Sequence, residues 1–430
     1  MLAKEYQRPI AVIDALSKYE VRSFPYLGNV PRVRWDGNPQ TGIDFLLKET
    51  LRNLHSLEAL ARFQQQGDRL FSRPPEFATL AGLGPGESVL YPDPPLGKGE
   101  ARRLAKTRIE VATPLERLAL ERPLQGKRIA LSMSESTDIE RFGLDPIHLD
   151  AAMTELSRYL LIKGAMLAYG GHLGAEGYTQ RLLELVRAHT NSDDQRSPVN
   201  RIVNFRGWPL PRLSVEKLAE MEAVAETQEL LRPADIDETL HPDFTNTPAP
   251  FSATASAAHG FAWARGMTEM RAYQADAQRS GVIARVVLGG TFGVTVKVNE
   301  DGTRTERWYA GRVPGVLEEV VLSALANQPV FLLGAFGGAT RLVIDLLRGI
   351  DREEATWEFQ KRAPFAQEMK DLYDQRGLDW LDYPQMGSLL RSKGIAGLNP
   401  LLTVAEHEQL FDSLDPLEIA EFVLLGLGRM

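Results

Sequence analysis

The sequence predicts an α/β fold in which a mostly parallel sheet carries helices on both faces. Short apolar runs that are partly β-branched end in glycine, as at residues 286–288 and 330–333. Such runs are typical of strands buried on both faces of a parallel sheet. Between them, residues 317–326 repeat apolar side chains at helical spacing. The local unit is therefore strand, glycine turn, helix and strand.

The composition limits the class of protein. The net charge of −8 and the lack of a long Lys/Arg block argue against a nucleic-acid-binding surface. The 430 residues include no cysteine, which excludes disulfides, thiolate metal ligands and a cysteine nucleophile. No apolar run approaches the roughly 18 residues that span a bilayer, and the first residues lack the apolar core of a signal peptide. We therefore expect a cytoplasmic protein that does not contact membranes.

The chain length suggests about two or three domains or one large core with additions. Residues 1–125 are expected to form a mostly helical N-terminal region of unknown role, with a long amphipathic helix at 42–66. Residues 126–350 contain the strand and glycine patterns of the main domain. Residues 351–430 are expected to form a helical C-terminal extension, with apolar side chains that could pack on the main domain or on a second subunit.

The main domain begins with two predicted strands joined by a helix. Residues 127–134 form the first strand and run into a polar turn at 134–138, residues 150–163 form the helix, and residues 165–171 form the second strand. A helix at 180–189 follows, which gives a right-handed βαβ start. Open α/β sheets bind ligands at the carboxyl ends of their strands. The candidate ligand-binding residues of this part are Ser132, Ser134, Gly170, Gly171, Gly174, Tyr178 and Thr179.

A second group of candidates follows a predicted helix at 259–278, which contains Arg271. Gly289 and Gly290 end a strand, a β-hairpin is predicted across 291–311, and Gly315 precedes the helix with Glu318 and Glu319. Glycine turns at a helix N-terminus expose backbone N–H groups and let a phosphate come close. The alternative for each glycine pair is a tight turn without a ligand.

Other kinds of site find little support. His148, His172 and His259 lack metal-ligand spacing, so no metal site is predicted, and no cofactor is predicted either. Ser132 and Ser134 lack the G-x-S-x-G pattern of a serine hydrolase.

Leu167-Ala-Tyr-Gly-Gly171 and Gly315-Val-Leu-Glu-Glu319 resemble motifs of the SLOG superfamily, which includes the LONELY GUY phosphoribohydrolases and DNA-processing protein A. The second motif resembles the end of the family's "PGGxGTxxE" pattern. Its first half corresponds to Leu288-Gly-Gly290, the hairpin is inserted between the halves, and Val316 stands where the family has Thr. Residues 267–271 are similar to the segment that supplies the hydrolases' catalytic Arg. The resemblance covers residues 126–348 and implies a Rossmann-like nucleotide-binding domain.

Within the superfamily, the chain looks closest to the sensor branch found with Sir2 and TIR proteins in bacterial antiviral defence. That resemblance implies a receptor for a cyclic ADP-ribose-type messenger derived from NAD, a tendency to form homo-oligomers, and a separately encoded effector or TIR-type messenger producer as partner. The missing Thr and the inserted hairpin favour a sensor over a catalyst.

Three hypotheses remain open at this stage. A sensor would use the glycine turns to hold phosphates, Arg271 to pair with one of them, and Glu319 to accept ribose hydroxyls. An N-glycosidase would use Glu319 and Arg271 as catalytic residues on a nucleoside phosphate or an NAD-like substrate. A structural module would bind no small molecule. Simpler alternatives exist for these residues. Arg271 would then be a solvated residue on a helix, and Glu318 and Glu319 would be acids that are favourable at a helix N-terminus.

Overall fold

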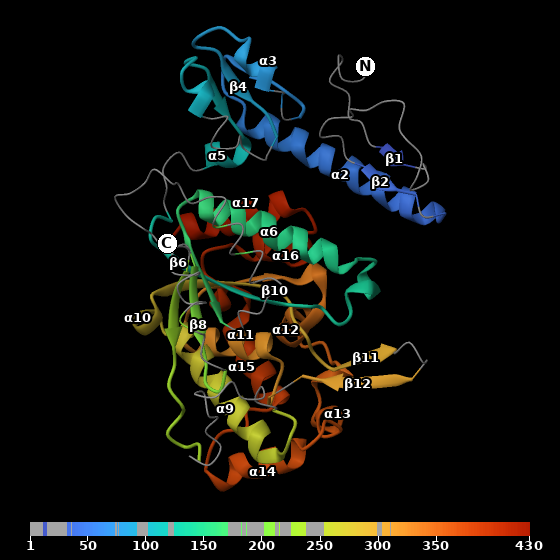
Figure 1. Ribbon diagram of the computed structural model, residues 1–430, viewed down its shortest axis with the longest axis vertical. Helices are drawn as coiled ribbons and strands as arrows, with labels where there is room; N and C mark the ends of the chain where they lie inside the picture. Colours follow the sequence, from blue (N-terminus) through green and yellow to red (C-terminus); the bar gives the residue numbers. More distant parts are fainter. Residues whose placement is uncertain are drawn as a thin grey trace. The chain divides into compact units, whose positions relative to one another are not determined.

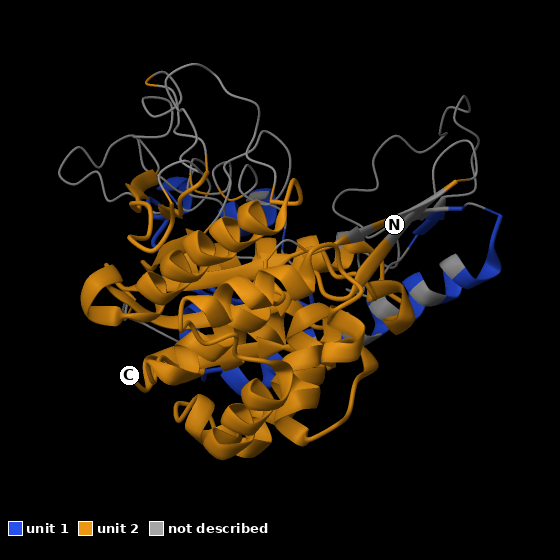
Figure 2. Cartoon of the chain, turned by 90° about the horizontal axis from the view of Figure 1, so that it is seen from below, with its two compact units in different colours: residues 1–121 blue, residues 122–430 orange. Residues whose placement is uncertain are grey.

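The chain divides into two compact units, Met1–Glu121 and residues 122–430 (Figure 2). The computed structural model describes residues 12–14, 32–35, 37–73, 75, 77–92, 102–118, 124–170, 182, 186, 202–210, 215, 225–237, 253–298, 303–309 and 311–430.

The first unit combines one long helix with short parallel strands. Its strands are β1 (Val12–Asp14), β2 (Arg32–Arg34), β3 (Asp68–Leu70), β4 (Ser88–Leu90) and β5 (Glu110–Ala112), and its helices are α2 (Pro39–Phe63), α3 (Phe77–Ala81) and α5 (Pro114–Leu118). The helix predicted at 42–66 corresponds to α2, where the side chain of Asn38 caps the N-terminus by accepting a hydrogen bond from the Gln40 amide. β1 pairs with β2, and β3, β4 and β5 form a second sheet. Three-residue strands are too short to show a period in the sequence, so the sequence patterns did not predict them.

The second unit is built on a parallel sheet of six strands among the described residues, in the order β13-β10-β6-β7-β8-β9. The strands are β6 (Arg128–Ser134), β7 (Met166–Gly170), β8 (Ile202–Arg206), β9 (Ala225–Glu229), β10 (Val282–Gly289) and β13 (Val330–Leu333). Every pair in this sheet is parallel. The Rossmann-like α/β class is therefore confirmed.

Helices cover both faces of this sheet. From β6 the chain moves through α6 (Pro146–Ile162) toward β7, whereas from β10 it moves through α11 (Gly315–Leu325) toward β13 on the opposite side. Because both crossovers are right-handed, α6 and α11 lie on opposite faces. α17 (Pro416–Gly428) packs beside α6, and α9 (Ala257–Ala275) packs beside α11 (Figure 1). The remaining helical segments are η1 (Ile139–Phe142), α10 (Ala277–Ser280), η3 (Gly334–Phe336), α12 (Gly338–Arg348), η4 (Glu353–Ala355), α13 (Trp357–Gln360), α14 (Ala366–Gln375), α15 (Tyr383–Leu398) and α16 (Val404–Asp412).

Two parts of the unit interrupt or extend the α/β pattern. The predicted hairpin is present as β11 (Val294–Val298) and β12 (Arg304–Trp308), paired antiparallel between β10 and α11 in the sequence. Residues 351–430 are helical as expected, and α15 packs with α11 and α12 over β10 and β13 in one buried apolar cluster. These C-terminal helices therefore belong to the same compact unit as the sheet.

Candidate functional site

A cavity of about 240 Å³ lies at the carboxyl ends of β6 and β7. β7 lies on one side of β6 and β10 on the other, so the chain leaves this edge of the sheet in opposite directions. Such a switch point opens a crevice in which α/β folds bind ligands. The cavity is lined by Leu131, Ser132, Met133, Ser134, Tyr169, Gly170, Arg271, Thr291, Tyr309, Gly315, Val316 and Glu319.

The N-terminus of α11 forms one wall of the cavity. Its first residues, Gly315 and Val316, line the space, and the preceding Pro314 supplies no side-chain cap. The first amides of a helix lack internal acceptors and carry the positive end of the helix dipole. A Cβ at Gly315 would lie 2.5 Å from Nη2 of Arg271. The missing side chain therefore lets the guanidinium lie directly against this helix end.

Two serines at the end of β6 present their hydroxyls to the same space. Oγ of Ser132 accepts a hydrogen bond of 2.6 Å from Nη1 of Arg285, and Oγ of Ser134 accepts one of 3.2 Å from the Thr291 amide. Within the described residues each hydroxyl acts only as an acceptor, so its own O–H is available to donate. The serines and the α11 amides together make a donor-rich lining, which suits an anion.

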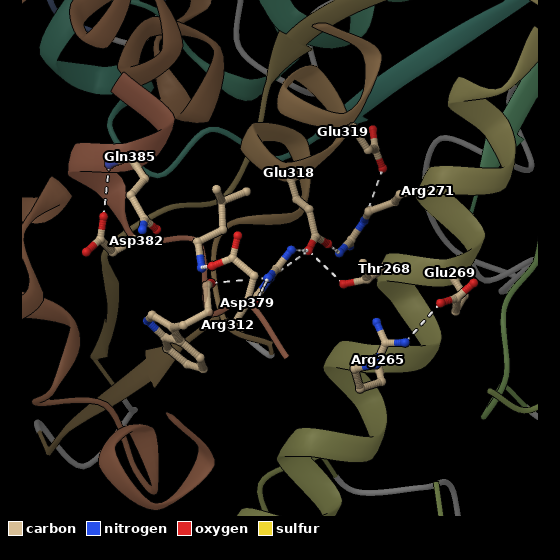
Figure 3. A network of polar contacts seen from close by, with 12 residues as sticks. Arg265, Thr268, Glu269, Arg271, Arg312, Glu318, Glu319, Asp379, Asp382 and Gln385 are labelled. Carbon is tan, nitrogen blue, oxygen red and sulfur yellow. Dashed lines mark hydrogen bonds and ion pairs between the residues drawn. The ribbon is translucent and has the colours of Figure 1, made fainter. Parts of the chain in front are cut away.

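Glu318 points into a polar network between α9 and α11 (Figure 3) and is not among the residues that line the cavity. Its Oε1 accepts hydrogen bonds from Thr268 Oγ1 at 2.7 Å and from Arg312 Nε at 3.0 Å. Its Oε2 accepts from Arg271 Nη1 at 2.5 Å. Arg312 in turn donates to the carbonyls of Asp379 and Trp380. Glu318 therefore fixes the guanidinium of Arg271 and does not line the cavity.

Glu319 lies on the other side of the Arg271 guanidinium and does line the cavity. Its Oε1 is 3.5 Å from Arg271 Nε, and its Oε2 accepts from Arg285 Nη1 at 3.1 Å. Arg285 is 1% exposed and stands in the middle of β10, on the same sheet face as Ser132, because β10 pairs with β6 at Val287 and Ser132. It also donates to Ser323 and Gln274.

The buried cluster has an excess of positive charge among the described residues. Within the part of the chain that the structure describes, the guanidinium groups of Arg271, Arg285 and Arg312 contact only the carboxylates of Glu318 and Glu319 as charged partners. Three cations therefore face two anions. Nη2 of Arg271, next to Gly315, forms no hydrogen bond with any described residue. A buried charge of this kind needs a counterion, which an anionic ligand in the cavity would supply.

The pKa directions agree with this arrangement. Burial by itself would raise the pKa of Glu318, but Arg271 and Arg312 outweigh it and leave the pKa lowered. Burial would lower the pKa of Arg271, but Glu318 and Glu319 leave it raised. For Arg285 burial prevails and lowers the pKa, with Glu319 opposing and Arg271 adding to the effect. Arginine stays charged in all these settings.

Tyr309 lies at the other wall of the cavity, directly after β12. Its hydroxyl is 3.1 Å from the hydroxyl of Tyr383 at the start of α15. Burial raises the pKa of Tyr309 to about 12, so the hydroxyl is neutral at physiological pH. Thr291, at the other end of the hairpin, lines the same cavity and donates from Oγ1 to the Glu135 carbonyl. Both ends of the inserted hairpin therefore contribute to the site.

Gly289 and Gly290 lie outside the cavity lining and pack against the start of α12. The Ala339 amide donates to the Gly290 carbonyl at 2.8 Å, and Thr340 Oγ1 donates to the Gly289 carbonyl at 2.9 Å. A Cβ at Gly290 would lie 2.8 Å from Cβ of Ala339. This turn therefore holds protein backbone where the sequence suggested a phosphate.

Of the predicted site residues, the structure brings six together around the cavity: Ser132, Ser134, Gly170, Arg271, Gly315 and Glu319. Four others, Gly171, Gly174, Tyr178 and Thr179, lie outside the described residues. Sequence reasoning missed Arg285, Arg312, Thr291 and Tyr309. The sequence could have indicated Arg285, because this charged residue interrupts an otherwise apolar run predicted as a buried strand, and a buried charge needs a polar partner.

The described residues contain no cluster of His, Asp or Glu that could hold a metal ion. Their helices include none that is both long and apolar enough to cross a membrane.

The comparisons with known proteins agree with the fold. A search of curated proteins gave no match. The family model "SLOG cluster2" matches residues 123–410, which is more than half of the chain and includes every residue of the cavity. The SLOG resemblance noted in the sequence is thereby confirmed, and the chain belongs to the SLOG superfamily as a Rossmann-like, nucleotide-related domain.

Proposed function

We propose that this protein is a sensor that binds a phosphate-containing nucleotide, of the cyclic ADP-ribose kind derived from NAD, in the cavity at the end of β6. One observation carries the proposal: among the described residues, a buried cluster with one more positive than negative charge places Arg271 in the cavity lining, with its Nη2 beside the N-terminus of α11, which has no side-chain cap. Guanidinium and helix N-terminal amides are the groups that proteins use to bind phosphate.

A ribose has a place beside this anion site. Glu319 and the serines Ser132 and Ser134 line the same cavity, and a carboxylate or a hydroxyl can accept from sugar hydroxyls. The volume of about 240 Å³ is slightly below the 300–1,000 Å³ range typical of small-molecule sites. It suits the phosphate, ribose and part of the base of one nucleotide. The membership in a nucleotide-related family supports the same ligand class.

Binding without turnover fits the surroundings of Glu319 better than catalysis. Both of its carboxylate oxygens lie near guanidinium groups, Oε1 near Arg271 and Oε2 bonded to Arg285. These contacts occupy both oxygens, which leaves the carboxylate less free to attack a sugar carbon. An N-glycosidase is the second candidate, because Glu319 is an acidic residue in the cavity lining and could orient a water molecule.

We further propose that the messenger belongs to bacterial antiphage defence, in keeping with the sensor branch that the motifs resemble. In this proposal a TIR-type enzyme produces the messenger, and oligomerisation or a separately encoded effector transmits the response. The N-terminal unit and helices α13 to α17 are the candidate output elements. Arg312 links Glu318 to the carbonyls of Asp379 and Trp380, so a change at the cavity has a direct contact to the C-terminal helices.

The test measures thermal stability and product formation together. The full chain is incubated with NAD, ADP-ribose, cyclic ADP-ribose isomers and nucleoside monophosphates. A ligand at a hundredfold excess over its Kd adds about 2.7 kcal/mol to the stability of the native state. Stabilisation by one nucleotide without release of base supports the sensor. Release of free base makes the protein a glycosidase, and no response to any of these compounds refutes both.

A matched pair of variants on α9 tests the site itself. Arg271→Gln removes the cation that faces the cavity, and we expect affinity to fall at least about tenfold, the size of a lost charged hydrogen bond. Arg265 on the same helix pairs with Asp235 and Glu269 and does not line the cavity. Arg265→Gln should leave affinity unchanged. Equal affinity of the two variants would contradict the site assignment.

A further inference from the structure

The cavity has two chemically different sides. The α11 side presents the charged side chains of Arg271 and Glu319 and the exposed backbone of Gly315. The hairpin side presents the side chain of Tyr309, whose ring is flat and largely apolar. A ligand that joins a phosphate to an apolar, flat group would match both sides.

Tyr309 is held rigidly on the apolar side. Its hydroxyl is bonded to Tyr383, which is 1% exposed and starts helix α15, where Asp382 forms a capping box with Gln385. The neighbouring Trp308 packs its ring against Phe359 of α13, with 5.3 Å between ring centroids. Because the hydroxyl is already bonded to the protein, the ring is what Tyr309 offers to a ligand. A ring that is already fixed loses little conformational entropy when it binds a flat partner.

We propose that Tyr309 determines the ligand specificity of this site: its ring packs against the nucleobase while the phosphate lies at Arg271 and the N-terminus of α11. This inference rests on the proposed function and adds to it the residue that recognises the base of the ligand. The hairpin that interrupts the family motif thereby acquires a role, since its end delivers the ring to the cavity. Base–aromatic stacking tolerates different bases, so the ring selects for the presence of a base.

The test compares AMP with ribose 5-phosphate, which share the phosphorylated ribose and differ in the base. Binding of each to the full chain is measured by titration calorimetry. We expect the wild-type protein to bind AMP about tenfold to a hundredfold more tightly, the range of stacking on one aromatic ring. In Tyr309→Leu this advantage should disappear, while the affinity for ribose 5-phosphate stays the same. Tyr309→Phe keeps the ring and should retain the preference for AMP within about threefold.

Trp308→Leu is the matched control, because it removes the adjacent aromatic ring, which packs on Phe359 and does not line the cavity. It should leave the ratio of the two affinities unchanged, and melting temperatures show whether each variant is folded. The inference is overturned if Tyr309→Leu still prefers AMP, if it loses both ligands equally, or if the wild-type protein binds ribose 5-phosphate as tightly as AMP. In this last case the phosphate site stands. If the wild-type protein binds neither compound, the inference is overturned, while the proposed function is decided separately by the panel of NAD, ADP-ribose, cyclic ADP-ribose isomers and nucleoside monophosphates.

Discussion

Helices α11 and α12 both begin at a glycine turn beside the sheet, yet their N-termini have different partners. At α12 the Gly338 amide donates to Oδ1 of Asp138 at 2.6 Å, and the turn packs on the carbonyls of Gly289 and Gly290. At α11 the N-cap residue Pro314 gives no side-chain cap, and Gly315 lines a cavity next to Arg271. One helix end is neutralised by an internal carboxylate, and the other is open to an external anion.

The comparison shows that a glycine pair at a strand end does not by itself identify a ligand site. Gly289 and Gly290 fit the sequence pattern best, but there the chain brings its own backbone and acid into contact. What identifies the α11 end is the arrangement of charged side chains from three elements: Arg271 from α9, Arg285 from β10 and Glu319 from α11. Substitutions at the two helix ends test this difference.

The largest effect is expected at the closed end. Gly338 has φ +68°, and a Cβ there would lie 2.6 Å from the backbone of Gly289 and Gly290. Gly338→Ala should therefore lower the free energy of unfolding by about 4 kcal/mol or prevent folding, since backbone cannot move aside cheaply. Chemical denaturation measures the loss.

Gly349, at the other end of α12, is the control for that variant. It also has positive φ, +73°, but a Cβ there would meet only Cδ of Arg391 at 3.7 Å. Gly349→Ala should cost only the backbone penalty of about 1–2 kcal/mol. Similar losses in the two variants would mean that the close packing of the α12 turn contributes nothing.

The second effect concerns the network that holds Arg271 at the open end. Glu318→Gln leaves Arg271 and Arg312 without their shared buried carboxylate, so stability at pH 7 should fall by about 3 kcal/mol. The pKa of Glu318 is lowered from its ordinary value of 4.5, because Arg271 and Arg312 outweigh the effect of burial. Its contribution is therefore complete above pH 4.5 and is lost as pH falls through the folded-state pKa.

Denaturation of the wild type and of Glu318→Gln between pH 7 and pH 3 tests the direction of this pH dependence. The difference between the two proteins should shrink as the pH drops below 4.5. A difference that stays constant over this range, or grows, would contradict the proposed role of the carboxylate.

A smaller effect is expected from the internal anion at α12. Asp138→Asn keeps an oxygen acceptor for the Gly338 amide but removes the charge at the helix N-terminus, so stability should fall by about 1 kcal/mol. Glu140, two residues away, is exposed, and Glu140→Gln is the matched control. If both variants unfold at the same denaturant concentration as the wild type, the carboxylate is not what neutralises α12.

The sequence predicted much of this architecture, because long buried strands and helices carry a clear period. The strand at 330–333 matches β13 in both bounds, and the hairpin and the helices of residues 351–430 are present as expected. Three of the six candidates around the cavity, Ser132, Ser134 and Gly170, meet there because parallel strands end at the same edge of a sheet. The pairing of Arg312 with Glu318 could not be predicted, because Arg312 reaches the cluster through tertiary packing that leaves no local pattern.

The last prediction separates affinity from stability at the open end. Gly315 has no positive φ, and Ala has the higher helix propensity, so Gly315→Ala should cost little stability or even add some. Its Cβ, however, would lie 2.5 Å from Nη2 of Arg271, so the guanidinium must turn away from the N-terminus of α11. We expect nucleotide affinity, measured by calorimetry, to fall about tenfold while the melting temperature stays nearly unchanged.

Gly397→Ala in α15 is the control, because a Cβ there meets only Cβ of Lys393, at 3.6 Å. This variant should leave the nucleotide affinity unchanged and should alter the melting temperature only by the higher helix propensity of alanine. If Gly315→Ala binds as the wild type does, then close contact between Arg271 and the helix end is not needed for binding. The open N-terminus of α11 would then be no more a ligand site than the closed one of α12.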